Sequence, residues 1–292
     1  MNDKISIFGS TGFIGKRFCE LYPDNVIKVN RNDRKSETTN ILYLISTVDN
    51  YNIHSNLHID IDTNLKILME VLEANKGKDI IVNFVSSWFV YGQNQEMPFK
   101  ENHTVCNPTG FYSITKYCAE QMLICYCNTF NIKYRIFRLA NVLGEGDLKI
   151  SRKKNALQFL IKELINNRDL HLYYNGEVIR DYIYIDDVCN AINLCMQTAP
   201  TNQIINIGSG SPLKFLDIIE KAIEKTSSKS NIINIEPSTF HNIVQVRHSY
   251  LDTSKIKSYG FKLKYDIDLI LDKLINFYSK SIVNSGRSYD LK

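Results

Sequence analysis

Apolar and polar residues alternate along the first half of the chain with two periods, one typical of strands and the other of helices. Short apolar runs predict buried strands at 4–8, 26–29, 41–45, 80–85 and 134–139. Segments that read as helices lie between these runs, at 12–21, 64–74 and 112–129. This alternation predicts an α/β fold in which a doubly wound parallel sheet carries helices on both faces.

The pattern departs from this regularity at two places. Between Val29 and Ile41 there is no room for both a helix and a strand, so the sheet is expected to be abbreviated there. After Asn141 the pattern becomes less regular, and the clearest helices are expected at 156–166 and 215–225.

Composition excludes several classes of protein. The 292 residues carry a net charge of +4, with 44% hydrophobic and 23% charged residues, as expected of a globular protein. No apolar run reaches the roughly 18 residues of a membrane span, and we expect no signal peptide before the first predicted strand. We therefore expect a cytoplasmic location and no membrane partner. One compact basic cluster, Arg152, Lys153 and Lys154, is too little to predict a nucleic acid partner.

The cysteines predict neither disulfides nor a metal site. The chain has seven, an odd number, without a C-x-x-C motif. Cys118, Cys125 and Cys127 fall in one predicted helix, and further ligands at suitable spacing are missing. Reduced thiols and no bound metal are expected.

A glycine-rich segment follows the first predicted strand and opens the first predicted helix. Glycines at this point let the backbone turn tightly and approach a pyrophosphate at the positive helix N-terminus. Loops also use glycine for positive φ, but the place of this segment in an alternating chain favours a dinucleotide site. The expected cofactor contacts are Gly9, Thr11, Gly12, Phe13, Ile14 and Gly15.

The end of the second predicted strand indicates which dinucleotide is bound. An acidic residue there would bind the ribose 2′-hydroxyl of NAD, but the chain has Asn30, Arg31 and Asn32. Arginine between asparagines suits a 2′-phosphate through charge-assisted hydrogen bonds. NADP(H) is therefore favoured over NAD, while an exposed loop arginine is the other interpretation.

Three residues predict acid–base chemistry. Tyr112 and Lys116 are i, i+4 neighbours at the start of a predicted helix, and Ser87 ends a buried strand 25 residues before Tyr112. An ammonium beside a phenol is expected to lower the pKa of the phenol and make it a usable acid or base. The motif Y-x-x-x-K is common by chance, but chance is a poor explanation for all three residues together.

These motifs resemble the extended short-chain dehydrogenase/reductases, the NAD(P)-dependent sugar-nucleotide epimerase/dehydratase family. The resemblance runs from Ile5 to about Phe277. It rests on the glycine loop, the Y-x-x-x-K motif, and the segments V-S-S-W-F-V-Y-G at 85–92, R-L-A-N-V-L-G at 138–144, G-E-V-I-R-D-Y at 176–182, D-D-V at 186–188 and N-I-G-S-G at 206–210.

The resemblance implies roles for residues at matching positions. Ser87 would hold the substrate oxygen, Tyr112 would donate or accept the proton, and Lys116 would bind the nicotinamide ribose and tune Tyr112. Ser46, which follows the run 41–45, and Tyr112 are also expected among the cofactor contacts.

The same resemblance implies a substrate site. Asn141 would contact the substrate, and Arg180 with Arg247 would grip the diphosphate of a nucleotide sugar. Either arginine could instead pair with a carboxylate such as Asp181. Residues 1–141 and about 182–210 would form the Rossmann domain that binds NADP, and about 142–181 and 211–292 the smaller lobe that binds the nucleotide sugar.

The residues after Ser87 narrow the reaction. By the same resemblance, 4,6-dehydratases of the family carry T-D-E at this site, and combined epimerase-reductases carry S-S-C. This chain has Ser87 followed by Trp88 and Phe89. Two aromatic rings cannot act as acid and base, so dehydration and 3,5-epimerisation are not expected. Both rings could line the sugar pocket, Trp88 being counted among the substrate contacts, or pack in the core.

Of the reactions in this family, hydride transfer at C4 of the sugar is the one that remains. An NADPH-dependent 4-ketoreductase acting on a 4-keto-6-deoxy sugar is favoured by Arg31, and an NAD(P)-dependent 4-epimerase is the alternative. A non-catalytic NADP sensor is a third possibility, disfavoured because Ser87, Tyr112 and Lys116 are all present.

A homodimer is also implied by the resemblance, through helices equivalent to 62–75 and 111–128. One apolar face of the first helix, formed by Leu65, Leu68, Met69 and Leu72, is compatible with this. The same face would look identical if it packed against the protein's own sheet.

Overall fold

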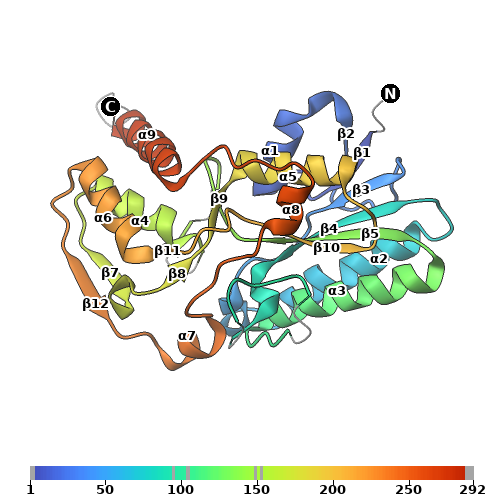
Figure 1. Cartoon of the computed structure of the whole chain (residues 1–292), viewed down its shortest axis with the longest axis horizontal. Helices are drawn as coiled ribbons and strands as arrows, with labels where there is room; N and C mark the ends of the chain where they lie inside the picture. Colours follow the sequence, from blue (N-terminus) through green and yellow to red (C-terminus); the bar gives the residue numbers. More distant parts are fainter. Residues whose placement is uncertain (1–3, 94–95, 103–105, 148–149, 152–153, 287–292) are drawn as a thin grey trace.

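The computed structural model describes residues 4–93, 96–102, 106–147, 150–151 and 154–286 (Figure 1). Its largest element is a six-stranded parallel sheet with the spatial order β10-β5-β4-β3-β1-β2. These strands are β1 (Ile5–Phe8), β2 (Val26–Lys28), β3 (Asn40–Tyr43), β4 (Ile81–Ser87), β5 (Lys133–Leu139) and β10 (Gln203–Ile207).

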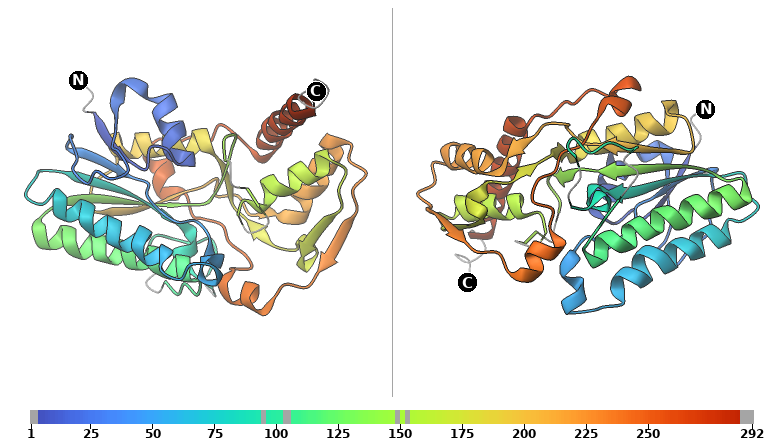
Figure 2. Two further views of the ribbon diagram at one scale, coloured as in Figure 1. Left: turned by 180° about the vertical axis from the view of Figure 1, so that it is seen from behind. Right: turned by 60° about the horizontal axis from the view of Figure 1, so that its bottom comes forward.

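Helices cover both faces of this sheet, which confirms the predicted fold class (Figures 1 and 2). α1 (Phe13–Leu21) and α5 (Ile185–Thr198) pack together on one face. α2 (Ile67–Ala74) and α3 (Phe111–Phe130) cover the other. Successive side chains of a strand point to opposite faces, so Leu42 packs in one apolar layer while its neighbours Ile41 and Tyr43 pack in the other.

The predicted abbreviation of the sheet is confirmed. The chain runs from β2 to β3 without a helix, and β2 pairs only with β1, so it forms the edge of the sheet. A cavity of about 460 Å³ lies beside this connection, lined partly by Lys28, Arg34 and Ala74.

One helix begins earlier than the sequence predicted. Before α2 the chain forms a π-helical turn, η3 (Ile61–Lys66). The side chain of Asn64 in this turn is buried and accepts a hydrogen bond from the Thr47 amide at 2.9 Å. A polar contact to another segment gives this turn a role that apolar periodicity does not reveal.

The apolar face 65–72 packs against the protein's own sheet. Leu68 and Leu72 are fully buried in the layer between α2, α3 and the strands, and Leu65 and Met69 pack against that layer. The face is therefore part of the core. α3 has its own exposed apolar residues, among them Ile114 and Met122.

The remaining elements form a smaller lobe beside the carboxyl ends of the strands (Figure 1). Three helices pack together in it: α4 (Ala156–Ile165) and α6 (Phe215–Thr226), both predicted, and α9 (Ile267–Gly286), which was not. Its short strands pair as β7 (Leu170–Tyr173) with β12 (Ile232–Ile235), and β8 (Ile179–Arg180) with β11 (Leu213–Lys214).

The lobe and the sheet are joined through several segments. β6 (Asn141–Leu143) pairs with β9 (Tyr182–Tyr184) where the chain passes between them. Two short helices, α7 (Thr239–Val244) and α8 (Ser254–Ser258), lie on the returning chain, and α8 contacts β10. No helix among the described residues is long and apolar enough to cross a membrane.

Candidate active site

A cavity of about 740 Å³ lies between the carboxyl ends of the strands and the lobe. The loop after β1, the chain after β3, the end of β4 and the start of α3 line it on the sheet side. Residues of β8, β9 and the segment after α7 line it on the lobe side. Ligands of open α/β sheets bind at this edge, so the cavity is the candidate active site.

The glycine loop has the shape of a phosphate cradle. Gly9 has a φ of +88°, and a Cβ on Gly15 would lie 2.2 Å from the carbonyl oxygen of Gly9. Gly12 caps α1 without a side chain, so no side-chain hydrogen bond occupies the amides of the first turn. All six loop residues predicted to contact the cofactor line the cavity, as does Ser46.

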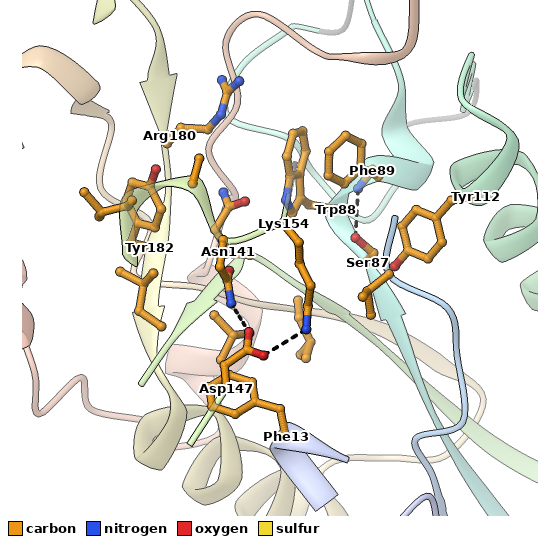
Figure 3. A pocket seen from close by; sticks show the side chains of 18 of the residues that line it. Phe13, Ser87, Trp88, Phe89, Tyr112, Asn141, Asp147, Lys154, Arg180 and Tyr182 are labelled. Atoms are coloured by element: carbon orange, nitrogen blue, oxygen red, sulfur yellow. Dashed lines mark hydrogen bonds and ion pairs between the residues drawn. The ribbon is translucent and has the colours of Figure 1, made fainter. Parts of the chain in front are cut away.

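Tyr112 and Ser87 meet on the wall of the cavity (Figure 3). Tyr112 is 7% exposed, and the side chains of Ser87 and Ser46 face its hydroxyl. Ser87 ends β4, where its Oγ accepts a hydrogen bond from the Phe89 amide at 3.3 Å. Burial raises the pKa of Tyr112 to about 12, although both serine side chains act to lower it.

This direction corrects the expectation that Lys116 lowers the pKa of Tyr112. The Lys116 ammonium instead donates to the carbonyl oxygen of Val85 at 2.8 Å and lies 4.2 Å from the centre of the Phe84 ring. Burial lowers the pKa of Lys116 to about 7. Desolvation is thus the main cause of both pKa shifts, and each shift favours the neutral form of its group.

The residues predicted to select NADP lie apart from this cavity. Asn30, Arg31 and Asn32 are exposed at the end of β2 and do not line it, although Asn30 and Asn32 line the second cavity at the sheet edge. Arg34, which the sequence reasoning did not identify, donates to the Arg31 carbonyl at 3.0 Å and pairs with Glu70 at 2.8 Å.

The two aromatic rings after Ser87 line the cavity as a stacked pair. The ring centres of Trp88 and Phe89 are 4.1 Å apart, and Phe89 meets Tyr112 edge-on at 6.3 Å. Trp88 is only 3% exposed, so it packs in the core and faces the cavity at the same time.

Two arginines stand at the lobe end of the cavity. Arg180 donates to the carbonyl oxygens of Ile179 and Arg247, and its guanidinium lies 5.9 Å from the Trp88 ring centre. Arg247 lies 4.7 Å from the ring centre of Tyr174. Neither arginine forms an ion pair within the part of the chain that the structure describes.

Asp181 does not pair with Arg180, the alternative that the sequence left open. Its carboxylate accepts hydrogen bonds from the amides of Ser209 and Leu251, at 2.9 and 3.2 Å. Asn141 donates its side-chain amide to the Asp181 carbonyl at 2.9 Å and lines the cavity. The asparagine, Arg180 and Arg247 therefore line one cavity.

The cavity also contains an ion pair that sequence reasoning missed. Lys154 lies 2.9 Å from the carboxylate of Asp147, and both residues line the cavity (Figure 3). The sequence suggested only that Lys154 belongs to a solvated basic cluster. Arg152 and Lys153, the other members of that cluster, lie outside the described residues.

Comparison with known proteins identifies the family. The model of the NAD dependent epimerase/dehydratase family matches residues 39–208, more than half of the chain. The chain belongs to this family. A putative UDP-glucose 4-epimerase from Methanocaldococcus jannaschii is 24% identical over 305 residues, which span 94% of this epimerase/dehydratase-family chain and 97% of that protein.

Solved structures of similar proteins share the fold of this family member. UDP-glucose 4-epimerase from Thermotoga maritima, solved with UDP-glucose, has a TM-score of 0.84 at 23% identity, covering 96% of this chain and 99% of that one. RMD from Pseudomonas aeruginosa, complexed with NADPH, has a TM-score of 0.82 at 17% identity with the same coverage of both chains.

Proposed function

We propose that this epimerase/dehydratase-family enzyme is an NADPH-dependent 4-ketoreductase acting on a nucleotide-linked 4-keto-6-deoxy sugar. One observation carries the proposal: Ser87, Tyr112 and Lys116 line the same cavity as the glycine loop and two arginines without ion-pair partners among the described residues. A dinucleotide and an anionic substrate can therefore meet beside a single phenol.

The residues present fit a bound dinucleotide. The tight packing of Gly15 against Gly9 and the amides at the start of α1 would hold its pyrophosphate. The absence of an acidic residue at position 30, with Arg31 beside it, supports NADPH over NAD. The family is described as NAD dependent, and RMD was solved with NADPH, so NAD is the alternative.

Tyr112 would protonate the oxygen at C4 of the sugar. NADPH, when bound, supplies the hydride that reduces the C4 keto carbon. With a pKa that burial raises to about 12, the phenol is protonated near neutral pH, as a proton donor must be before it reacts. Ser87, whose hydroxyl already meets that of Tyr112, would hold the same substrate oxygen.

The nucleotide diphosphate would lie between Arg180 and Arg247. Planar guanidinium groups bind phosphate oxygens with two parallel hydrogen bonds. Burial lowers the pKa of Arg180, and the same poorly screened surroundings strengthen the attraction of its charge to an anion. Asn141 would contact the sugar between these arginines and Tyr112.

We place NADP in residues 1–141 and about 182–210, and the nucleotide sugar against about 142–181 and 211–292. The pairing of β10 with β5 and the packing of α5 on α1 support this division. A homodimer through helices α2 and α3 is part of the proposal, and the exposed Ile114 and Met122 of α3 support it.

A 4-epimerase is the second candidate. Named 4-epimerases are among the similar proteins, and the same serine, tyrosine and lysine would serve a 4-epimerase. The stacked rings of Trp88 and Phe89 beside Tyr112 favour the reductase, because a keto intermediate must rotate within the sugar site during epimerisation.

Purified protein with NADPH and a panel of 4-keto-6-deoxy sugars on UDP, dTDP, GDP and CDP tests the proposal. Stoichiometric loss of NADPH absorbance with one sugar is expected. Interconversion of ordinary nucleotide sugars without net NADPH consumption would assign the epimerase. Tight NADP binding without turnover of the 4-keto-6-deoxy sugars or of ordinary nucleotide sugars would indicate a non-catalytic sensor.

A further inference from the structure

The proposed reaction makes no use of the ion pair that Lys154 and Asp147 form in the candidate active site. The ammonium lies 2.9 Å from the carboxylate, and both residues line the cavity (Figure 3). The Asp147 side chain is 3% exposed, whereas that of Lys154 is 23% exposed. The carboxylate is thus withdrawn into the wall, and the ammonium is the member of the pair that a ligand can reach.

The chain around Lys154 holds the ion pair in place. The Lys154 amide donates to the carbonyl oxygen and to the hydroxyl of Ser151, both at 3.1 Å, and the Ser151 amide donates back at 2.8 Å. Asn155 has a φ of +54°, and its side-chain amide donates to the second carboxylate oxygen of Asp147. As the N-cap residue of α4, Asn155 would ordinarily bond to the first turn of the helix, but its side chain does not. The local fold gives up a helix cap and fixes the carboxylate that holds Lys154.

Stability alone does not account for the ion pair. Removing two charges from water costs about as much free energy as their attraction returns, so a buried ion pair contributes little to folding. An ammonium has three N–H donors, and Asp147 is the acceptor that Lys154 has among the described residues. Donors of this ammonium therefore remain for a ligand in the cavity.

The charges of the cavity separate into two groups. Arg180 and Arg247 have no ion-pair partner among the described residues, which suits them to an anionic diphosphate. The charge of Lys154 is balanced by Asp147, so the pair attracts an anion less strongly and suits neutral hydroxyl groups. A hydrogen bond from a charged donor is also stronger than one between neutral groups.

The ion pair lies on the segment that carries the predicted sugar contact. Asn141 begins β6 and lines the cavity, and Asp147 follows four residues after that strand ends. Between them, a Cβ on Gly144 would lie 3.4 Å from the ring of Phe13. The segment thus runs from Asn141 toward the glycine loop that would hold the cofactor, and hydride transfer requires the sugar to lie beside the cofactor.

We propose that Lys154, positioned by Asp147, binds hydroxyl groups of the sugar and makes the enzyme prefer a nucleotide sugar over the free nucleotide. This rests on the substrate class of the proposed function, a sugar whose diphosphate lies at Arg180 and Arg247. A reductase and an epimerase would use the contact alike, so its test requires no turnover.

The test compares the binding of a nucleoside diphosphate with that of the same diphosphate linked to glucose. UDP, dTDP, GDP and CDP are titrated in both forms by calorimetry into the full-length protein saturated with NADPH. The base that the wild-type protein binds most tightly is then used throughout. The reduced cofactor cannot oxidise glucose, so binding is measured without reaction. Lys154→Met and Lys154→Arg are compared with Lys221→Met, which removes the lysine of an exposed ion pair with Asp268 in the same lobe.

Lys154→Met should raise the Kd of the glucose-linked diphosphate by about tenfold or more, the loss expected for a hydrogen bond from a charged donor. The Kd of the free diphosphate should change by less than about threefold. Lys154→Arg should recover part of the loss, because arginine keeps the charge and the donors. Lys221→Met should leave both Kd values unchanged. Equal weakening of both ligands would assign Lys154 to the phosphates and overturn the proposal, as would no change in either.

Asp147→Asn tests the positioning role. Without the carboxylate the ammonium is no longer held, so the preference for the glucose-linked over the free diphosphate should decrease. Because a negative charge leaves the cavity, the free diphosphate should bind at least as tightly as before. A preference equal to that of the wild type would refute the positioning role of Asp147.

The double variant Lys154→Met/Asp147→Asn keeps the test possible if Lys154→Met does not fold, because it leaves no unpaired buried carboxylate. The same loss is expected, and failure of both variants to fold would assign the pair a structural role and overturn the proposal. A wild-type protein that binds none of the glucose-linked diphosphates would overturn this proposal and the proposed function together. A loss confined to the glucose-linked ligand, in a protein that reduces no ketosugar, would refute only the proposed function.

Discussion

Tyr112→Phe removes one hydroxyl from the cavity and should leave the fold almost unchanged. The two serines that contact this hydroxyl keep other partners: Ser87 accepts from the Phe89 amide at 3.3 Å, and Ser46 donates to Asn64 at 3.0 Å. The free energy of unfolding should therefore fall by only about 1 kcal/mol, the net worth of a typical hydrogen bond.

The effect on catalysis should be much larger. A positioned general acid contributes about 10²–10⁴-fold to a rate, which corresponds to about 3–5 kcal/mol of activation free energy. Since the hydroxyl of Tyr112 meets those of Ser87 and Ser46 and not the glycine loop, NADPH affinity should change by less than about threefold, well under 1 kcal/mol.

The assay combines kcat for ketosugar reduction, NADPH binding by fluorescence titration, and the urea midpoint of unfolding. Tyr117→Phe is the matched control, because Tyr117 lies on the same helix and does not line the cavity. A loss of kcat below about tenfold would refute the assignment of Tyr112 as proton donor. Equal losses of kcat and of NADPH affinity would place its role in cofactor binding.

Two further predictions concern charge. Arg31→Ala should reduce the preference for NADPH over NADH by about tenfold or more, because it removes a charge-assisted hydrogen bond. The preference is the ratio of kcat/KM measured with each cofactor, and an unchanged ratio would show that Arg31 does not contact the 2′-phosphate. The pKa of Lys116 is about 7 in the folded chain and 10.5 in a model compound, so the unfolded chain binds more protons between these values. Wild-type stability should thus rise with pH across this window. Any stability advantage of Lys116→Met over the wild type, measured by urea unfolding, should therefore shrink from about pH 6 to about pH 9. An advantage that grows with pH would contradict the lowered pKa.

Local spacing explains what the sequence predicted of the site. A glycine loop between a strand and a helix, and two residues four apart on one helix face, are fixed by the geometry of a single element. The fold followed from alternating periods in the same way. The structure brings these local motifs into one cavity, together with Arg180 and Arg247 from distant segments.

Contacts between distant segments explain what the sequence did not predict. Lys154 carries no periodic signal, and its partner Asp147 is set by how the chain packs around the cavity. The pKa of Tyr112 depends on how deeply α3 buries the phenol, which spacing along the helix does not measure. Arg31 remained exposed, so its role is argued from residue type alone.

In the proposed reaction, hydride passes from NADPH to C4 of a nucleotide-linked keto sugar. The most direct measurement uses NADPH deuterated at the transferable position of the nicotinamide, followed by NMR of the isolated sugar nucleotide. One deuteron per product molecule is expected, bound to C4, with one NADP formed for each. A product without deuterium at C4, formed while the cofactor pool stays unchanged, would contradict it.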